Sequence, residues 1–205
     1  MAACLAALPT LQLLNIGFWS PLSHPPQTTP PPHICIVLLG LTQLVFRGIS
    51  EYFEDFVAQI DTPLLRELDI MLFMDLIFEI PRLRHFVGRA ERFKSLDQAT
   101  IEFYDRVIWI SDTNGFPRRF RLQILCKRAD WQLSSMVQIF GEQLPLLSHV
   151  EHLEIIQGHH ANIEWMDNPD MRSSLWLELF HLFIAVQTLH ISKKLVPPVF
   201  FFFFF

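Results

Sequence analysis

A six-residue pattern of apolar and polar positions recurs along this chain. It consists of an aliphatic residue, two variable residues, a leucine, one variable residue and a third apolar residue, as in Leu41, Leu44 and Phe46. Side chains two apart along a strand point to the same face, so the last two apolar residues of each copy predict one buried face of a short strand. Five copies occur, at residues 11–16, 41–46, 65–70, 150–155 and 186–191.

A single copy cannot bury its apolar face, whereas stacked copies can. The pattern therefore predicts an α/β fold, an irregular leucine-rich repeat solenoid of about five to six units. Short parallel strands would line one face and helices would lie on the convex side. The chain would be a fragment of a longer array.

The stretches between the copies predict the remaining elements. After the second copy, Phe53, Phe56 and Val57 fall at helical spacing, with Ser50 as the N-cap. Residues 74–80 predict a short helix ended by Pro81, and residues 83–86 a degenerate fourth strand. Further helices are predicted near residues 133–140, with Asp130 as a possible cap, and at 174–183.

The chain is expected to form one leucine-rich repeat domain over residues 1–199. A proline-rich loop occupies residues 20–33, where proline removes backbone donors. A hairpin-like insertion is predicted at about residues 105–125, because two β-rich runs flank Asn114-Gly115. Residues 200–205 form a poly-Phe tail that is expected to be unstructured. We interpret it as a coding artefact rather than an anchor, since six residues cannot span a bilayer.

Composition narrows the class of protein. The chain has 205 residues, of which 51% are hydrophobic and 18% charged, so wholesale disorder is not expected. The net charge is −5 with Lys and Arg scattered, which argues against a nucleic-acid partner. Polar residues within 175–191 argue against a membrane span. Three widely spaced cysteines fit a reducing compartment, so the predicted location is cytoplasmic or nuclear.

The sequence offers little that resembles catalytic chemistry. His149 and His152 are three apart, but on a strand their side chains would point to opposite faces, so no metal site is predicted. Cys126 precedes Lys127 and Arg128, which could lower a thiol pKa, yet no paired base is visible. A half-buried structural cysteine is therefore the favoured interpretation. We predict no catalytic, cofactor-binding or metal-binding residues, no cofactor and no enzymatic activity.

The function predicted from the fold is protein recognition. Residues that flank the buried pair of each copy would point to the exposed sheet face, where a target protein could bind. The candidate partner-binding residues are Asn15, Gln43, Arg47, Glu67, Asp69, His85, His152, Glu154 and His190.

Five stretches of the chain form a set that is more specific together than each is alone: residues 41–56, 60–65, 130–135, 143–150 and 176–180. They resemble the repeat region of F-box/leucine-rich repeat proteins that are abundant in mushroom-forming fungi. The resemblance runs from about residue 11 to residue 198. It implies a substrate-receptor role in a cullin-type ubiquitin ligase, with the repeats holding the target.

The chain departs from that family at its start. The family's F-box docks on a Skp-type adaptor and precedes the repeats, but here the first copy begins at Leu11 and no F-box helices fit before it. Binding to a Skp-type adaptor is therefore not expected. The alternative to a recognition module is a truncated or non-functional remnant, a structural repeat fragment without a partner.

Overall fold

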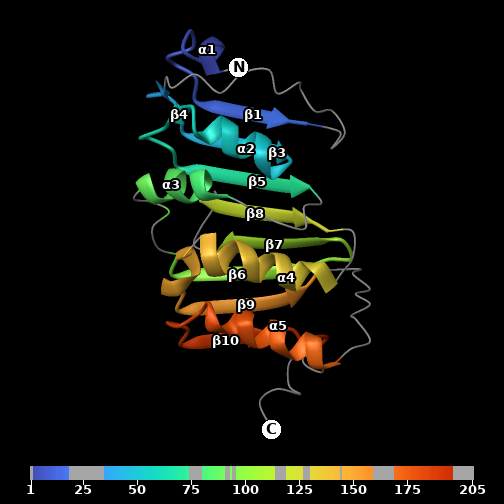
Figure 1. The fold of residues 1–205 in the computed structure, drawn as a ribbon. Coiled ribbons are helices and arrows are strands. Elements are labelled where there is room, and N and C mark those ends of the chain that lie inside the picture. The colour runs from blue at the N-terminus through green and yellow to red at the C-terminus, as the bar shows by residue number, and fades with distance from the viewer. Residues whose placement is uncertain are drawn as a thin grey trace.

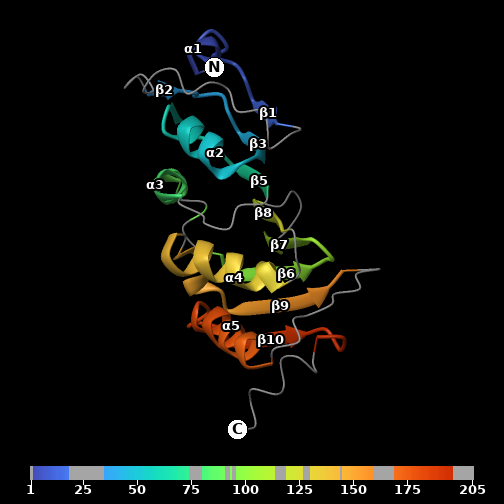
Figure 2. The same ribbon diagram turned by 45° about the vertical axis from the view of Figure 1, so that its right-hand side comes forward.

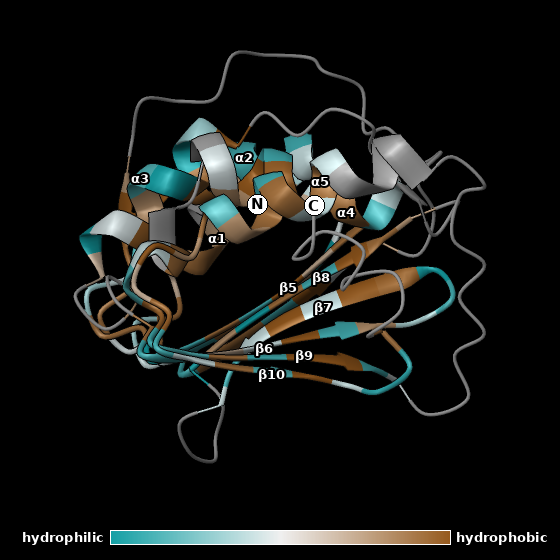
Figure 3. Cartoon of the chain, turned by 90° about the horizontal axis from the view of Figure 1, so that it is seen from below, coloured by the Kyte–Doolittle hydropathy of each residue, from teal (hydrophilic) through white to brown (hydrophobic). Residues whose placement is uncertain are grey.

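The chain folds into one eight-stranded, largely parallel sheet with helices on one of its faces (Figures 1 and 3). The computed structural model describes residues 2–18, 35–73, 80–90, 93, 96–113, 119–126, 130–143, 145–158 and 169–195. The predicted proline-rich loop at 20–33 and the tail at 200–205 lie outside these residues.

The strands of the main sheet follow one another almost in chain order. In sheet order they are β1 (Leu13–Gly17), β3 (Gln43–Gly48), β5 (Glu67–Phe73), β8 (Phe120–Leu125), β7 (Val107–Asp112), β6 (Gln98–Phe103), β9 (His152–Gln157) and β10 (Thr188–Ile191). A separate parallel pair consists of β2 (Ile36–Val37) and β4 (Ile60–Asp61).

The helices stack along one side of the sheet (Figure 2). They are α1 (Ala2–Leu5), α2 (Ser50–Val57), α3 (Pro81–Arg89), α4 (Asp130–Gln138) and α5 (Pro169–His181). A π-helical turn (Ile139–Gln143) and a 3₁₀ turn (Pro145–His149) follow α4.

Every predicted copy of the six-residue pattern forms a strand, as expected. The strands pair so that equivalent positions lie side by side: Leu44 is opposite Leu68, and Phe46 is opposite Ile70. The same alignment holds between β1 and β3 and between β9 and β10. In-register pairing therefore stacks the apolar residues of successive copies into continuous rows beneath the helices.

The main chain joins neighbouring copies in a repeated way. The carbonyl of Gln12 accepts hydrogen bonds from the N–H groups of Thr42 and Gln43, at 2.9 and 3.0 Å. The carbonyls of Thr42, Asp97 and Glu151 each accept two N–H groups of the next copy in the same manner. In all five copies the N–H of the first apolar residue also bonds to the carbonyl three residues earlier. The sequence repeat is thus a repeat of backbone geometry.

A sixth copy escaped the sequence analysis. Residues 96–101 place Leu96, Ala99 and Ile101 in the three apolar positions, and all three are buried. Their strand, β6, pairs in parallel and in register with β9, with Ala99 opposite Leu153. The copy was missed because alanine takes the place of the central leucine.

The predicted insertion is a β-hairpin, and it is integrated into the sheet. β7 runs antiparallel to both β6 and β8, while β8 pairs in parallel with β5. The strands of the recurring pattern are thus parallel, and β7 is the antiparallel strand of the predicted hairpin. The hairpin turns back from β6 and fills the space between β5 and β6 (Figure 1).

Two helix boundaries differ from the prediction. α2 begins at Ser50, and Ile49 occupies the cap position without a side-chain hydrogen bond, so the assignment of Ser50 as N-cap is wrong. Residues 83–86 belong to α3 rather than to a strand, and Pro81 is the first residue of that helix. Proline suits the first helical turn because its missing N–H has no intrahelical partner there. The predicted helix at 74–80 falls mostly outside the described residues.

Aromatic side chains fill the core between helices and sheet. Phe53 of α2 lies 4.5 Å from Phe46 of β3 between ring centroids, and both are fully buried. Trp176 of α5 lies 5.7 Å from Phe103 of β6. At the edge strand β10 the expected burial is incomplete, since Leu189 is 38% exposed and Ile191 is half-buried. Within the described part of the chain, no strand pairs with the outer edge of β10.

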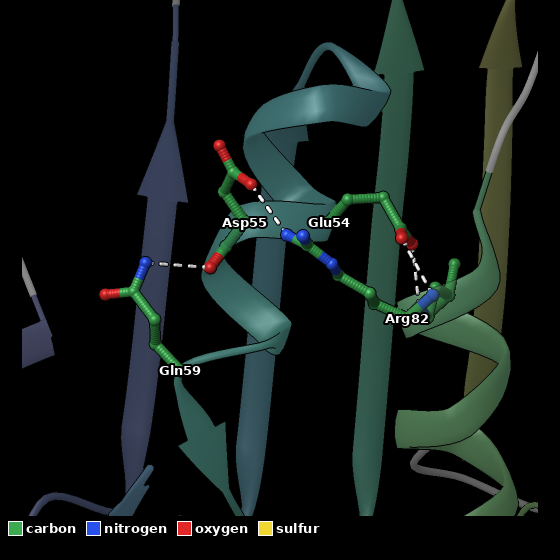
Figure 4. Close-up of polar contacts among 5 residues, drawn as sticks. Glu54, Asp55, Gln59 and Arg82 are labelled. Carbon is green, nitrogen blue, oxygen red and sulfur yellow. Dashed lines mark hydrogen bonds and ion pairs between the residues drawn. The ribbon is translucent and has the colours of Figure 1, made fainter. Parts of the chain in front are cut away.

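A buried carboxylate joins two of the helices (Figure 4). Glu54 of α2 is 7% exposed, and its two oxygens accept the main-chain N–H groups of Arg82 and Leu83, each at 2.7 Å. These N–H groups belong to the first turn of α3, where Ile80 offers no capping side chain. Glu54 therefore caps a neighbouring helix rather than its own. The adjacent ion pair between Asp55 and Arg82, at 2.8 Å, is exposed to solvent.

Replacing this carboxylate should destabilise the fold. We expect Glu54→Ala to lower the free energy of unfolding by about 2–4 kcal/mol, because two N–H groups at the start of α3 lose their acceptor. Urea unfolding followed by circular dichroism measures the change. Asp55→Ala is the matched control and should cost less than about 1 kcal/mol, since it removes only an exposed ion pair. Equal losses in the two variants would contradict the capping role of Glu54.

Glu54 should also make stability depend on pH. Burial raises the pKa of Glu54 above its ordinary value of 4.5, against the opposing effect of its hydrogen bonds to Leu83 and Arg82. As pH rises, the Glu54 carboxyl ionises at a lower pH in the unfolded chain than in the folded chain. The stability that Glu54 contributes is therefore fully present below pH 4.5, and it is lost as pH rises through the pKa of the folded chain.

We therefore expect the free energy of unfolding of the wild-type chain to fall across this window more steeply than that of Glu54→Gln. Urea titrations at a series of pH values give both slopes. Identical slopes would show that Glu54 does not titrate differently in the folded and unfolded chains.

Candidate functional site: the open face of the sheet

The face of the sheet opposite the helices carries the candidate site. No helix in the described part of the chain lies on it (Figure 3). Strand register aligns one residue of each strand in a line across this face, here called the middle row. In sheet order the middle row is Asn15, Val45, Asp69, Arg121, Ser111, Thr100, Glu154 and His190. Seven of these eight side chains are polar, although Ser111 and Thr100 are buried and add little to the exposed surface.

Eight of the nine candidate residues predicted from the sequence lie in strands on this face. They are Asn15, Gln43, Arg47, Glu67, Asp69, His152, Glu154 and His190. The placement of His85 on a strand is wrong, because it is an exposed residue of α3 on the helical side. The other eight share one surface but fall into separate groups. Their role in binding a partner stays a prediction.

Asp69 is the centre of the first group. Its carboxylate accepts a hydrogen bond from Nε2 of Gln123 at 3.2 Å and lies 3.6 Å from Nη1 of Arg121. The Arg121 guanidinium also lies 5.9 Å from the ring centroid of Trp109, within the range of a cation–π contact. Residues from β5, β7 and β8 are thus joined by polar and aromatic contacts at the middle of the sheet.

The second group lies at the end of the sheet formed by β6, β9 and β10. Glu154 accepts a hydrogen bond from Oγ1 of Thr100 at 3.5 Å and lies 3.2 Å from Nδ1 of His190. The His190 side chain is 73% exposed, so this pair adds little to stability. Its exposed donors and acceptors are accessible to a partner.

An apolar patch adjoins the middle row toward the carboxyl ends of the strands. Its side chains are half-buried and alternate with core residues along β5, β8, β7, β6 and β9. The patch consists of Met71, Phe73, Leu125, Val107, Trp109, Tyr104 and Ile156. The rings of Tyr104 and Trp109 are 4.9 Å apart, and the Tyr104 hydroxyl donates to Glu102 at 2.6 Å.

The most distinctive residues of this face were missed by sequence analysis. Trp109, Arg121 and Gln123 come from the hairpin, which was treated as an insertion outside the repeat. The signal was the alternation Phe120-Arg-Leu-Gln-Ile124, which places Arg121 and Gln123 on the face opposite Phe120. Without knowing that β8 pairs with β5, the sequence does not show that these side chains join Asp69.

Cys126 was the candidate nucleophile, and its surroundings keep it protonated. Burial raises the pKa of the Cys126 thiol to about 11, although Ser135, 3.9 Å away, lowers it slightly. A thiol with this pKa is not ionised at neutral pH. Among the described residues, no group of three or more His, Cys, Asp or Glu side chains is placed to hold a metal ion. In the same part of the chain, no helix has the length and apolar character needed to cross a membrane.

A pocket of about 490 Å³ lies on the other side of the molecule, between residues 61–66 and the end of α3. Arg89 is one of the charged residues that line it. Its guanidinium is bound to Asp61 at 3.5 Å and to the carbonyl of Ile60 at 3.4 Å. These contacts tie α3 to β4, which is a structural role.

Comparisons with protein-family models, curated proteins and solved structures found no match to this chain. The interpretation of the open face therefore rests on its geometry and chemistry.

The aromatic part of the apolar patch depends on a glycine. A Cβ added to Gly158 would overlap the Tyr104 ring, with Cδ1 and Cζ at 2.6 and 2.7 Å. We expect Gly158→Ala to displace this ring from Trp109 and to cost about 1–3 kcal/mol. Near-ultraviolet circular dichroism reports the ring displacement and urea unfolding the stability.

Gly17→Ala is the matched control, because a Cβ there meets no atom within 4 Å. It should change stability by less than about 0.5 kcal/mol. An unchanged aromatic spectrum in Gly158→Ala would contradict the packing of Tyr104 over this glycine.

Proposed function

We propose that this chain is a non-catalytic protein-recognition module whose open sheet face binds a target protein. Its role would be like that of the substrate-binding repeats of an F-box ubiquitin-ligase receptor, in the cytoplasm or nucleus. The observation that carries the proposal is the middle row, which runs across all eight strands opposite the helical layer.

The architecture we infer for the module is an irregular leucine-rich repeat solenoid. Six copies of the apolar pattern form strands that run in the same direction, and neighbouring copies share the carbonyl that accepts two N–H groups. β7 and β8 interrupt the array without breaking the sheet. A repeat array of this kind offers an extended binding surface.

The chemistry of the open face suits protein recognition. Interface centres are rich in Tyr, Trp, Met and Arg, and their rims are polar. Here Trp109 contacts Tyr104 and Arg121, and Met71 lies two strands away on the same face. Polar residues of the middle row border this group. An apolar centre with a polar border supports both affinity and selectivity for a protein partner.

The proposal is tested by changing exposed residues of the open face. Asn15→Arg, His152→Glu and His190→Glu, combined in one chain, alter the charge of this face without touching the core. We expect the proteins captured by the wild-type chain to bind this variant at least about tenfold more weakly, because mismatched charges oppose association. Affinity capture with quantitative mass spectrometry measures the loss.

A variant of the helical side provides the matched control. His85→Glu combined with Glu178→Arg changes two exposed residues on α3 and α5, and it should leave the captured proteins unchanged. If both variants lose the same proteins, or neither loses any, the open face is not the recognition surface. The second outcome would favour a structural remnant without a partner.

A further inference from the structure

We propose that the apolar patch around Trp109 is the anchor site of this face, and that it binds a target segment with a bulky apolar side chain beside a carboxylate. This inference rests on the proposed recognition function and names the chemistry of the partner. It joins three observations: half-buried apolar side chains outside the core, two hydrogen-bond donors without acceptors, and a rigid aromatic pair.

The patch is separate from the core of the protein. Its side chains point away from the helices, whereas the alternating residues Ile108, Ile110 and Ile124 are fully buried beneath them. Five strands about 4.8 Å apart carry the patch, so it extends roughly 20 Å across the sheet. Apolar surface gathered in this way on a sheet face without a helical layer is typical of an interaction site.

Two donors at this site have no acceptor. Nε1 of Trp109 and Nε of Arg121 are buried and make no hydrogen bond. Buried donors are almost always satisfied in folded proteins, so each such donor calls for a specific explanation. The two residues are in contact, with the Arg121 guanidinium 5.9 Å from the Trp109 ring. After a small shift of these two side chains, an acceptor from a partner would satisfy both Nε1 of Trp109 and Nε of Arg121.

The free N–H donors of Arg121 favour a carboxylate as this acceptor, because a guanidinium binds carboxylates through paired hydrogen bonds. The two nearby acidic side chains are already engaged: Asp69 by Gln123 and Arg121, and Glu102 by the Tyr104 hydroxyl. Asp69 lies 3.6 Å from a single nitrogen of Arg121, and a guanidinium has five N–H donors. Arg121 therefore retains N–H donors for the carboxylate of a partner.

The aromatic pair prepares the site for an apolar side chain. Gly158 leaves room for the Tyr104 ring, which packs 4.9 Å from Trp109 and is fixed through its hydroxyl to Glu102. Met71 of β5 and Ile156 of β9 lie two strands away on either side, beyond Gln123 and Glu102. Rings held in place in this way lose little conformational freedom on binding, which favours an anchor role.

Nuclear magnetic resonance of the full chain with ¹⁵N-labelled tryptophan tests this assignment. The probes are 3-phenylpropionate, which combines a ring with a carboxylate, and its neutral analogue 3-phenylpropionamide. We expect saturable shifts of the Trp109 indole N–H with a Kd in the millimolar range for so small a ligand, and at least about threefold weaker binding of the amide. The indole signals of Trp131 and Trp176 should not move.

Two variants support the reading of these signals. Trp109→Phe assigns the Trp109 resonance by removing it. Arg121→Gln should reduce the preference for the carboxylate over the amide to about one, because the charged donor group is lost. The unchanged Trp176 signal, from the core, verifies that this variant is folded.

Several results would overturn the assignment. These are the absence of a saturable Trp109 shift up to about ten times the expected Kd, equal binding of the two probes, and shifts shared by all the indoles. Self-association that Trp109→Phe abolishes would also overturn it, since a second copy of the chain would then occupy the patch. If the open-face variant loses its partners while Trp109 does not respond, recognition by the face stands and only this anchor is wrong.

Discussion

The structure depends on the register in which its parallel strands pair. Each strand is short, and a slip by one residue would move its apolar side chains from the helical face to the open face. The carbonyls of Gln12, Thr42, Asp97 and Glu151 resist such a slip, because each binds two consecutive N–H groups at the start of the next copy. The same register that stacks leucines in the core aligns the middle row on the other face, so core packing and surface pattern have one origin.

The irregular part of the array supplies the most distinctive chemistry of the open face. A regular repeat would place β6 next to β5, but the hairpin of β7 and β8 separates them. It continues the core rows with Leu122 and Ile110, and it adds Trp109 and Arg121 to the open face. The insertion therefore preserves the fold while changing the surface.

The sequence predicted what depends on local pattern and failed where distant contacts decide. Strands at Leu44, Leu68 and Leu153 follow from alternation, and the hairpin from its turn residues. The copy at residues 96–101 was not predicted because Ala99 replaces the central leucine. Ala99 is nevertheless buried in the row opposite Leu153, so its methyl group is enough at this position. The α3 helix has no capping residue of its own. Its first turn is capped by Glu54, which lies 28 residues before Arg82 in the chain, so the local sequence did not predict a helix there. The contact of Asp69 with Arg121 likewise required knowledge of strand order.

Two buried polar sites on opposite faces of the sheet differ in how their polar groups are matched. On the helical side, the buried carboxylate of Glu54 is matched by two N–H groups, and this arrangement holds α2 and α3 together. On the open side, Trp109 and Arg121 have buried donors without acceptors. Satisfied polar groups specify a packed structure, whereas unsatisfied ones reduce its stability unless a partner supplies what is missing. Under the proposed function, the capping contact of Glu54 would serve stability, whereas the two donors near Trp109 would be left for an acceptor from a partner.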